Sequence, residues 1–201
     1  WPLKTTLNNR QDFGKLIWER GLTWWEHSMF FPRRFITPSR IAFPLVATHP
    51  HFILDRGFKV FKQTSPAISL PKDAKEETYL QIFGVVNSSV GWFWGKQSYF
   101  ERGGYAEGKW QERVNINATP LSNHPIPKHF PLILSREIDR LARYLSEYSP
   151  EALSSRDAVN STALAEAKLK ASSIRAQMIS LQEELDWQCY RHYGLIDVED
   201  H

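Results

Sequence analysis

The stretch that decides the fold is residues 37–63, which read TPSRIAFPLVATHPHFILDRGFKVFKQ. Short apolar runs alternate there with basic residues and histidines. Prolines and a glycine separate these runs, which favours short strands over a helix, because proline cannot continue a helix and glycine can take the positive φ of a tight turn. Apolar runs interleaved with cations and imidazoles are typical of a DNA-binding surface.

Further strand patterns lie within this stretch and after it. Four β-rich runs are predicted as strands: 42–48, 52–54, 58–61 and 67–70. Asp55-Arg56-Gly57 separates the second run from the third, and this pattern predicts a hairpin turn in which Gly57 takes a positive φ. Residues 114–117 predict one more strand, and the prolines between 120 and 131 predict an extended connector after it.

A helical period begins after the strand runs. Leu80, Phe83 and Val86 share one helical face and predict a helix over 76–86. Asn87-Ser88-Ser89 ends this helix and caps a following one, because short polar side chains accept hydrogen bonds from the first N–H groups of a helix.

The rear of the chain is predicted to be helical at 135–146 and 161–193, because neither segment contains Pro or Gly. Apolar residues recur in the second segment at spacings of three and four, which is a heptad seam: Leu164, Ala167, Ala171, Ile174, Met178, Leu181 and Leu185. At about 1.5 Å per residue this helix spans roughly 45 Å. It therefore needs a partner, either the shorter helix or another protein.

These elements predict an α+β fold, with a small mixed or antiparallel β domain that includes helices and a helical, coiled-coil-like spacer after it. We place the first domain at 1–134 and the spacer, which would serve for docking, at 135–201. A hydrophobic content of 42% favours a folded chain over a disordered one. The chain begins at Trp1 rather than Met, which favours a part of a longer protein.

Composition excludes several classes of protein. Cys189 is the one cysteine, which excludes an internal disulfide and a zinc cage built from cysteines in this chain. No apolar run approaches the length that crosses a membrane. We therefore expect a cytoplasmic protein with no membrane partner.

Positive charge is concentrated in the front of the chain. Residues 1–63 hold ten Lys/Arg against four Asp/Glu, whereas 135–201 hold eight against twelve. This asymmetry is expected if the front meets phosphate and the rear meets a protein surface, although ordinary charge scatter gives the same pattern.

Side chains that could neutralise phosphates or read base edges are basic or polar. The candidates are Arg33, Arg34, Arg40, His49, His51, Arg56, Lys59, Lys62, Gln63, Lys96, Gln97, Arg102, Lys109 and Arg113. For most of them a solvated surface charge is the commoner role. We expect the Arg33-Arg34 pair and the glycine-containing loop 101–113 to contribute most, since recognition residues concentrate on loops.

Two constellations have a metal-binding or catalytic interpretation. His49 and His51 would point to the same face of a strand, but a metal site needs further ligands, so packing or a DNA contact is preferred. Ser88, His124 and Asp139 offer a nucleophile, a base and an acid, but no strained turn frames Ser88, and a capping role explains it better. We predict no catalytic site and no metal site in this chain.

Four segments carry a family resemblance: 46–57 (VATHPHFILDRG), 80–89 (LQIFGVVNSS), 125–127 (PIP) and 185–195 (LDWQCYRHYGL). Together they resemble the target-recognition region of adenine-specific DNA methyltransferases of bacterial phage-defence systems. The similarity points to the BREX-type methyltransferases, with type IIG restriction–modification enzymes and DISARM methyltransferases as relatives. It covers the chain from about Trp24 to Leu195.

The resemblance implies sequence-specific recognition of double-stranded DNA on behalf of an adenine-N6 methyltransferase. In that family the catalytic domain carries a glycine-rich loop for S-adenosylmethionine and an Asn-Pro-Pro-Tyr-type motif, and this sequence has neither. We expect no cofactor in this chain and S-adenosylmethionine elsewhere in the parent protein. The implied partners are duplex DNA, the methyltransferase domain and other defence-system proteins.

The alternative is an assembly module. In that interpretation the heptad helix binds other proteins of a defence complex, and the basic face is incidental.

Overall fold

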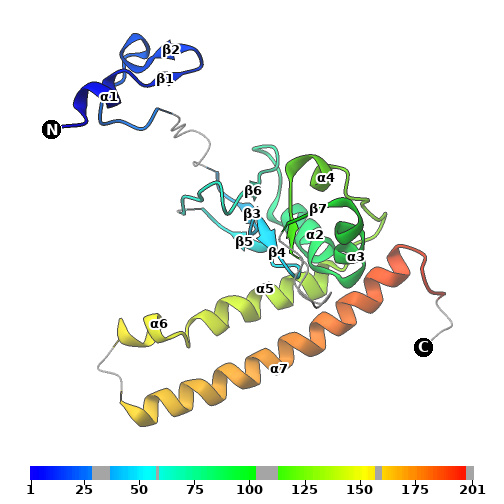
Figure 1. The fold of residues 1–201 in the computed structure, drawn as a ribbon. Helices are drawn as coiled ribbons and strands as arrows, with labels where there is room; N and C mark the ends of the chain where they lie inside the picture. The colour runs from blue at the N-terminus through cyan, green and yellow to red at the C-terminus, as the bar shows by residue number, and fades with distance from the viewer. Residues whose placement is uncertain (29–36, 58, 103–112, 157–159, 198–201) are drawn as a thin grey trace. The chain divides into compact units, whose positions relative to one another are not determined.

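The computed structural model describes residues 1–28, 37–57, 59–102, 113–156 and 160–197. The chain forms two compact units, Trp1–Ile36 and Thr37–His201 (Figure 1). The first unit contains α1 (Lys4–Asn8), β1 (Gln11–Asp12), β2 (Lys15–Leu16) and the 3-10 helix η1 (Ile17–Arg20). Its two strands pair antiparallel, and Arg20 forms an ion pair with the buried Asp12.

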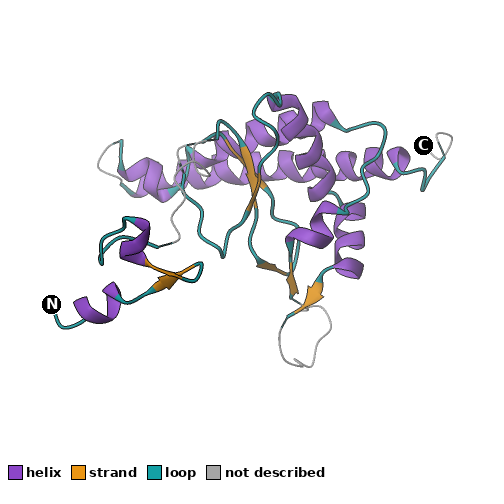
Figure 2. Ribbon diagram, turned by 90° about the horizontal axis from the view of Figure 1, so that it is seen from above, coloured by secondary structure: helices purple, strands orange, loops and turns teal. Residues whose placement is uncertain are grey.

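The second unit contains two small antiparallel sheets. The first has the order β5-β3-β6 and consists of β3 (Arg40–Ala42), β5 (Ile53–Asp55) and β6 (Ala67–Ile68). The second has the order β4-β8-β7 and consists of β4 (Val46–Ala47), β7 (Phe100–Glu101) and β8 (Val114–Asn115). Figure 2 shows β7 and β8 on the side of the unit away from the longest helix.

Helices make up the rest of this unit. They are α2 (Glu76–Asn87), α3 (Ser89–Ser98), α4 (Ala118–Ser122), α5 (Leu132–Ser146), α6 (Pro150–Ser154) and α7 (Ser161–His192). The predicted α+β class is confirmed, with small antiparallel sheets, interleaved helices and a helical rear part.

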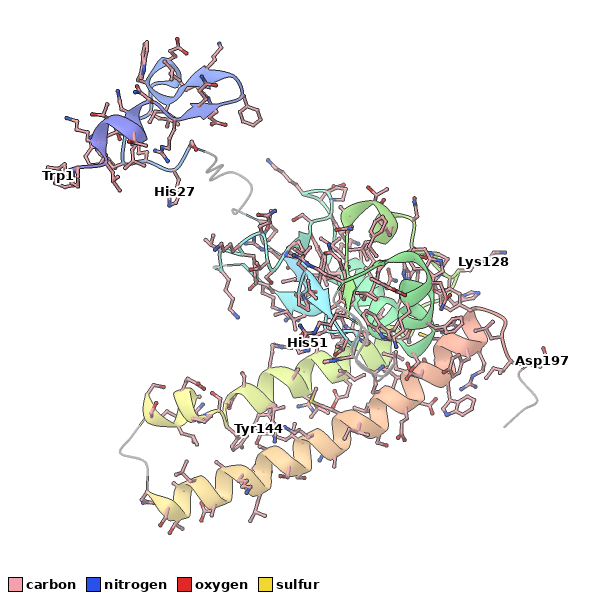
Figure 3. The ribbon with its side chains drawn as sticks, viewed as in Figure 1. Trp1, His27, His51, Lys128, Tyr144 and Asp197 are labelled. Carbon is pink, nitrogen blue, oxygen red and sulfur yellow. The ribbon has the colours of Figure 1, made fainter. Side chains whose placement is uncertain are left out.

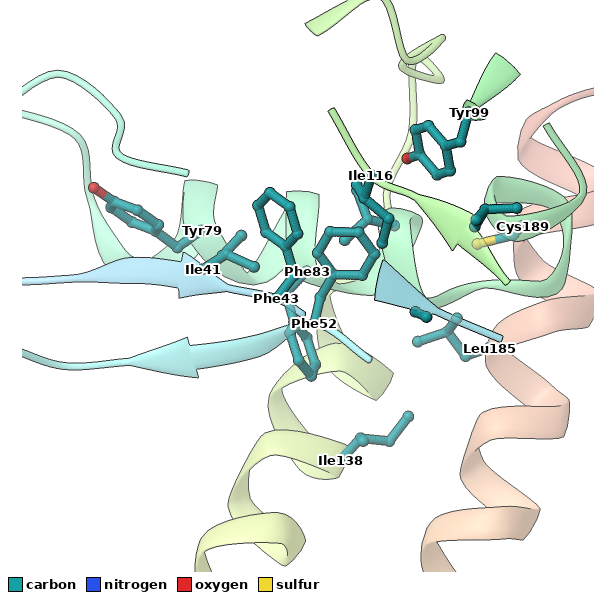
Figure 4. Packing of buried hydrophobic residues seen from close by; sticks show 13 residues of the cluster. Ile41, Phe43, Phe52, Tyr79, Phe83, Tyr99, Ile116, Ile138, Leu185 and Cys189 are labelled. Atoms are coloured by element: carbon teal, nitrogen blue, oxygen red, sulfur yellow. The ribbon is translucent and has the colours of Figure 1, made fainter. Parts of the chain in front are cut away.

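One hydrophobic cluster holds the second unit together. Phe43, Phe52 and Phe83 gather between the strands and the helices, with Ile138 from α5 and Leu185 from α7 in the same cluster (Figure 4). The cluster therefore contains residues from both sides of position 134. The division into a recognition domain, 1–134, and a spacer, 135–201, stays a prediction.

The predicted strand 42–48 is wrong as a single element. The chain enters one sheet as β3, passes Phe43-Pro44-Leu45, and enters the other sheet as β4. Pro44 has no N–H group to donate to a ladder, so a continuous strand cannot pair along its whole length. Around this change of sheet, Phe43 and Leu45 line one hollow, and Pro44 and Val46 line another.

The predicted hairpin at Asp55-Arg56-Gly57 is also wrong. Gly57 does take a positive φ of 91°, but β5 pairs with the earlier strand β3, and residues 59–61 form no strand. Phe58 lies outside the described residues. The side chain of Arg56 donates to carboxylates on α2 and α5.

Several helix predictions are confirmed with shifted ends. The helices expected over 76–86 and 161–193 are α2 and α7, and the one expected over 135–146 begins three residues earlier, as α5. The connector is not wholly extended, because α4 includes Pro120. A proline fits there because the first N–H groups of a helix have no partner inside it. α6 was not predicted.

Most of the heptad seam of α7 is covered within the chain, whereas its first residue, Leu164, is 47% exposed. Ala167, Ala171, Ile174 and Leu185 are buried, and α7 packs against α5 and α3. Figure 1 shows α5 and α7 side by side over much of their length. The shorter helix is therefore the main partner of the seam, whereas a supercoiled geometry stays a prediction.

The junction Asn87-Ser88-Ser89 ties together three helices and a strand. Phe52 N donates to Asn87 Oδ1 at 3.0 Å, and Asn87 Nδ2 donates to the carbonyls of Phe52 and Phe83, each at 3.0 Å. Ser88 Oγ accepts from Gly91 N at 3.1 Å, which confirms its predicted capping role. Ser89 N and Oγ both donate to Asp186 of α7.

We expect Asn87→Ala to lower the free energy of unfolding by about 2–3 kcal/mol, because it leaves the N–H and carbonyl of Phe52 without partners in a partly buried place. Urea denaturation followed by circular dichroism measures this. Asn123→Ala, an exposed asparagine at the end of α4, is the matched control. An equal decrease in the free energy of unfolding in the two variants would show that the bonds of Asn87 do not stabilise the fold more than an exposed asparagine does.

His124 is a buried polar residue after α4. Its ring lies edge-on to Trp94, with 4.8 Å between ring centroids, and 8% of the residue is exposed. Burial lowers the pKa of His124 to about 4. The imidazole is therefore neutral in the folded protein at pH 7.

We expect folding stability to fall as pH drops from about 6.5 towards 4, because in this window only the unfolded chain gains a proton at His124. The loss attributable to His124 between pH 7 and pH 5 is about 2 kcal/mol. It is measured as the difference in pH dependence between the wild type and His124→Leu in urea denaturation. His27→Leu, at an exposed position of the first unit, is expected to keep the wild-type dependence.

Candidate nucleic-acid interface

The sheet β4-β8-β7 has one face towards the core and one towards solvent. Ala47 and Val114 are paired and buried, so they face the core. Side chains alternate along a strand, so the neighbouring paired positions Val46, Asn115 and Phe100 lie on the other face. Val46 and Asn115 are half-buried there, and Asn115 Oδ1 is itself buried. Phe100 is 63% exposed. This outward face is the candidate interface.

Two arginines extend the outward face beyond the strand ends. Arg102 N donates to Arg113 O at 2.8 Å, which continues the pairing of β7 with β8 by one step. Both residues are exposed and lie two positions from Phe100 and Asn115, so by alternation they fall on the same face. The predicted loop 101–113 is thus present at its two ends, whereas 103–112, with Lys109, lies outside the described residues.

The histidine pair lines a groove on this face. A hollow of about 550 Å³ is lined by Pro44, Val46, Ala47, Thr48, His49, His51 and Arg113. The two imidazole centroids are 5.9 Å apart, and Thr48 Oγ1 lies 3.0 Å from His49 Nδ1. Neither histidine is in a strand, because both lie, with Pro50 between them, in the segment that joins β4 to β5. Figure 3 shows His51 beside these strands.

The groove can bind anions and planar groups. Arginine offers a fork of donors to phosphate or guanine, and imidazoles can donate to phosphate oxygens. Phe100 adds an exposed ring of the kind that stacks on bases. The structure therefore brings together His49, His51 and Arg113 from distant parts of the sequence, with Arg102 on the same face.

Two predicted cations lie inside ion-pair networks. Arg40 is buried in β3, with its Nε 3.2 Å from a carboxylate oxygen of Asp55 and its guanidinium 5.3 Å from the Phe61 ring centre. Arg56 donates to Asp139 at 2.6 and 3.1 Å and to Glu76 at 2.7 and 3.1 Å. These bonds, chiefly those to Asp139, raise the pKa of Arg56. The structure gives both arginines a packing role, and their DNA contacts stay predictions.

The other candidates are scattered or undescribed. Lys59, Lys62, Gln63, Lys96 and Gln97 are exposed, the last two at the end of α3 before β7. Gln63 lines a different cavity, lined also by His124. Arg33 and Arg34 lie outside the described residues.

Sequence reasoning missed Phe100, Thr48 and Asn115 as parts of this face. The sequence does place Phe100 beside the start of the predicted loop, next to Glu101. The direction of its side chain, however, depends on the pairing of Phe100 with Asn115 across a long loop.

The alternative constellations do not assemble. Ser88 Oγ donates to Val85 O at 2.7 Å rather than to His124, and Asp139 is bonded to Arg56 and Arg143. Within the described ranges, no group of three or more His, Cys, Asp or Glu residues lies close enough to hold a metal ion. The described part of the chain also has no helix long and apolar enough to cross a membrane.

Comparisons with known proteins give one informative similarity. No protein-family model matches the chain. The chain is 35% identical over 205 residues to the adenine-specific methyltransferase PglX of Streptomyces coelicolor. This alignment covers 97% of the chain and 17% of the methyltransferase, so the chain spans about one sixth of that relative's length. The similarity to an adenine-specific methyltransferase is confirmed, and a role in target recognition stays a prediction.

We expect Arg56→Ala to lower the free energy of unfolding by about 2 kcal/mol, because the nearly buried carboxylate of Asp139 loses a two-bond partner. Arg113→Ala is the matched control and is expected to leave unfolding unchanged, since its side chain is exposed. Urea denaturation of both variants measures the difference. Similar losses would contradict this division into packing and surface arginines.

Proposed function

We propose that this chain recognises a target sequence in duplex DNA for an adenine-N6 methyltransferase of a BREX-type phage-defence system. The observation that carries the proposal is the outward face of β4-β8-β7, where Arg102, Arg113, His49, His51 and Phe100 come together. The similarity of almost the whole chain to a segment of an adenine-specific methyltransferase supports it.

A two-stranded ribbon fits the major groove of DNA, where each base pair presents a distinct pattern of donors and acceptors. In the proposal, β7 and β8 form such a ribbon, and the arginines at its outer end contact phosphates or a guanine. His49 and His51 would contact the backbone beside it. Lys96 and Gln97 at the end of α3, and Arg33, Arg34 and Lys109, complete the proposed set.

S-adenosylmethionine binding and methyl transfer would take place in another part of the longer protein, where the target adenine is extruded from the duplex. Residues 1–134 would then form the recognition domain, and 135–201 would dock it. The packing of α5 against α7 supports a stiff spacer, because the two helices brace each other.

A second candidate is the assembly module. Its supporting observation is that Leu169, Ile179 and Trp187 of α7 are 73%, 60% and 44% exposed, outside the seam that α5 covers. Exposed apolar side chains along a helix are common at protein–protein contacts.

The test is binding of the chain to a random-sequence duplex library at several salt concentrations, with sequencing of the retained pool. We expect one short motif to be enriched. The double variant Arg102→Gln/Arg113→Gln should weaken binding and reduce the slope of log K against log salt by about 2, because each lost phosphate contact removes roughly 0.9.

The matched control is Arg140→Gln/Arg175→Gln, which removes the same charge from exposed positions of α5 and α7. It should retain the wild-type motif and nearly the wild-type slope. An equal loss in both double variants would indicate non-specific attraction. A folded chain that binds no duplex at low salt would contradict the proposal and favour the assembly module.

A further inference from the structure

The side of α7 that faces away from α5 carries a second stripe of apolar and small residues. Ala165, Leu169, Ser172, Ala176 and Ile179 are separated alternately by four and three residues, so they share one face of the helix. All five are exposed, and the exposed fractions of Leu169 and Ile179 are 73% and 60%. We call this face the outer stripe.

The outer stripe is separate from the seam that α5 covers. An α-helix turns by about 100° per residue, so Leu169 lies about 200° around the helix from the buried Ala167, and Ala176 lies as far from the buried Ile174. α5 lies along the inner side of α7 over much of their length (Figure 1). The long helix therefore has apolar residues on two opposite faces, of which the described part of the chain buries one.

The residue types of the outer stripe are those of a contact between helices. None of its five residues is charged, whereas a helical face that meets water is usually polar or charged. Three are Ala or Ser, which let a neighbouring backbone approach closely, and Leu169 and Ile179 can fill the holes of a facing helix. Lys168 and Arg175, both exposed and both next to the stripe, border it on one side.

The size of the outer stripe indicates the kind of partner. From Ala165 to Ile179 the helix rises about 21 Å, and a helix is about 10 Å wide, so the face offers roughly 200 Å². A stable contact between separate proteins takes about 800 Å² from each partner. A helix of the same polypeptide needs far less, because the connecting chain keeps its effective concentration in the millimolar range. The relative of Streptomyces coelicolor carries its similar segment within a chain about six times as long.

We propose that the outer stripe is covered by an amphipathic helix from another part of the same, longer methyltransferase. This helix presents apolar residues at heptad spacing to the stripe and carboxylates to Lys168 and Arg175. The inference rests on the proposed function only in taking this chain as a part of such an enzyme. It makes α7 the middle of three helices, with α5 on one side, and it identifies the face by which the helical rear part is fixed to the rest of the enzyme.

The test compares the labelling of a thiol on the stripe, Ile179→Cys, in the 201-residue chain and in the longer enzyme that contains it. The reagent is N-ethylmaleimide, and mass spectrometry of peptides locates the label. Cys189 is buried, and burial raises the pKa of its thiol to about 11, so it is labelled slowly. The matched control is Gln177→Cys, which is also exposed but lies about 160° away around α7.

We expect the two thiols to be labelled at similar rates in the 201-residue chain. In the longer enzyme, Ile179→Cys should be labelled at least about tenfold more slowly and Gln177→Cys at an unchanged rate, because the reagent reaches a covered thiol only when the contact opens. Adding Leu169→Glu should restore the rapid labelling of Ile179→Cys, since a buried carboxylate without a partner breaks the contact.

A charge reversal tests the chemistry of the partner. In the longer enzyme, Lys168→Glu/Arg175→Glu should also speed the labelling of Ile179→Cys, because it places carboxylates opposite carboxylates. Lys170→Glu, at an exposed position outside the stripe, should leave the rate unchanged. An equal effect of these two variants would contradict the proposed carboxylates.

Three results would overturn the proposal. One is equal labelling of Ile179→Cys in the 201-residue chain and in the longer enzyme. Another is slow labelling already in the 201-residue chain. The third is protection that grows with protein concentration, which would identify a second copy as the partner. An enzyme that protects this thiol but selects no DNA motif would contradict the proposed function alone, whereas one that selects a motif and leaves the thiol reactive would contradict this inference alone.

Discussion

The hydrogen bonds of Asn87 to the backbone of Phe52 are the constraint on which the second unit depends. One amide side chain holds both the N–H and the carbonyl of Phe52, and so fixes the entry to β5 against the end of α2. Of the next two residues, Ser88 caps α3 by accepting from Gly91 N, and Ser89 donates to Asp186 of α7. Three consecutive polar residues thereby orient the strand, two consecutive helices and the long helix with respect to one another.

The geometry of the candidate interface also depends on this junction. Phe52 follows His51 directly, so fixing its backbone also limits where the histidine pair can lie. In the other direction, α3 leads through Tyr99 into β7, and Gly95 lies so close to the Tyr99 ring that a side chain at this position would clash with it. The junction at Asn87-Ser88-Ser89 therefore positions both borders of the outward face. The histidine pair is positioned through Phe52, and β7 is positioned through α3.

Local patterns predicted the elements but not their partners. The capping serine, the period of α2 and the length of α7 depend on contacts within a few residues, and each is confirmed. The partner of β5 and the change of sheet at Pro44 depend on contacts between distant residues, and there the predictions were wrong. In the same way, sequence placed His49 and His51 together but could not separate Arg56, bound to Asp139, from Arg113, which is exposed.

The segment Phe43–Val46 gives the two hollows a common wall. Its alternation sends Phe43 and Leu45 inward and Pro44 and Val46 outward, while its backbone is held by Leu45, which donates to Thr64 O and accepts from Ile116 N. The same stretch of backbone therefore carries side chains that line both hollows. The cavity lined by His124 and the proposed recognition surface thus lie on two faces of one short segment, and the pairing partners that hold this segment position both.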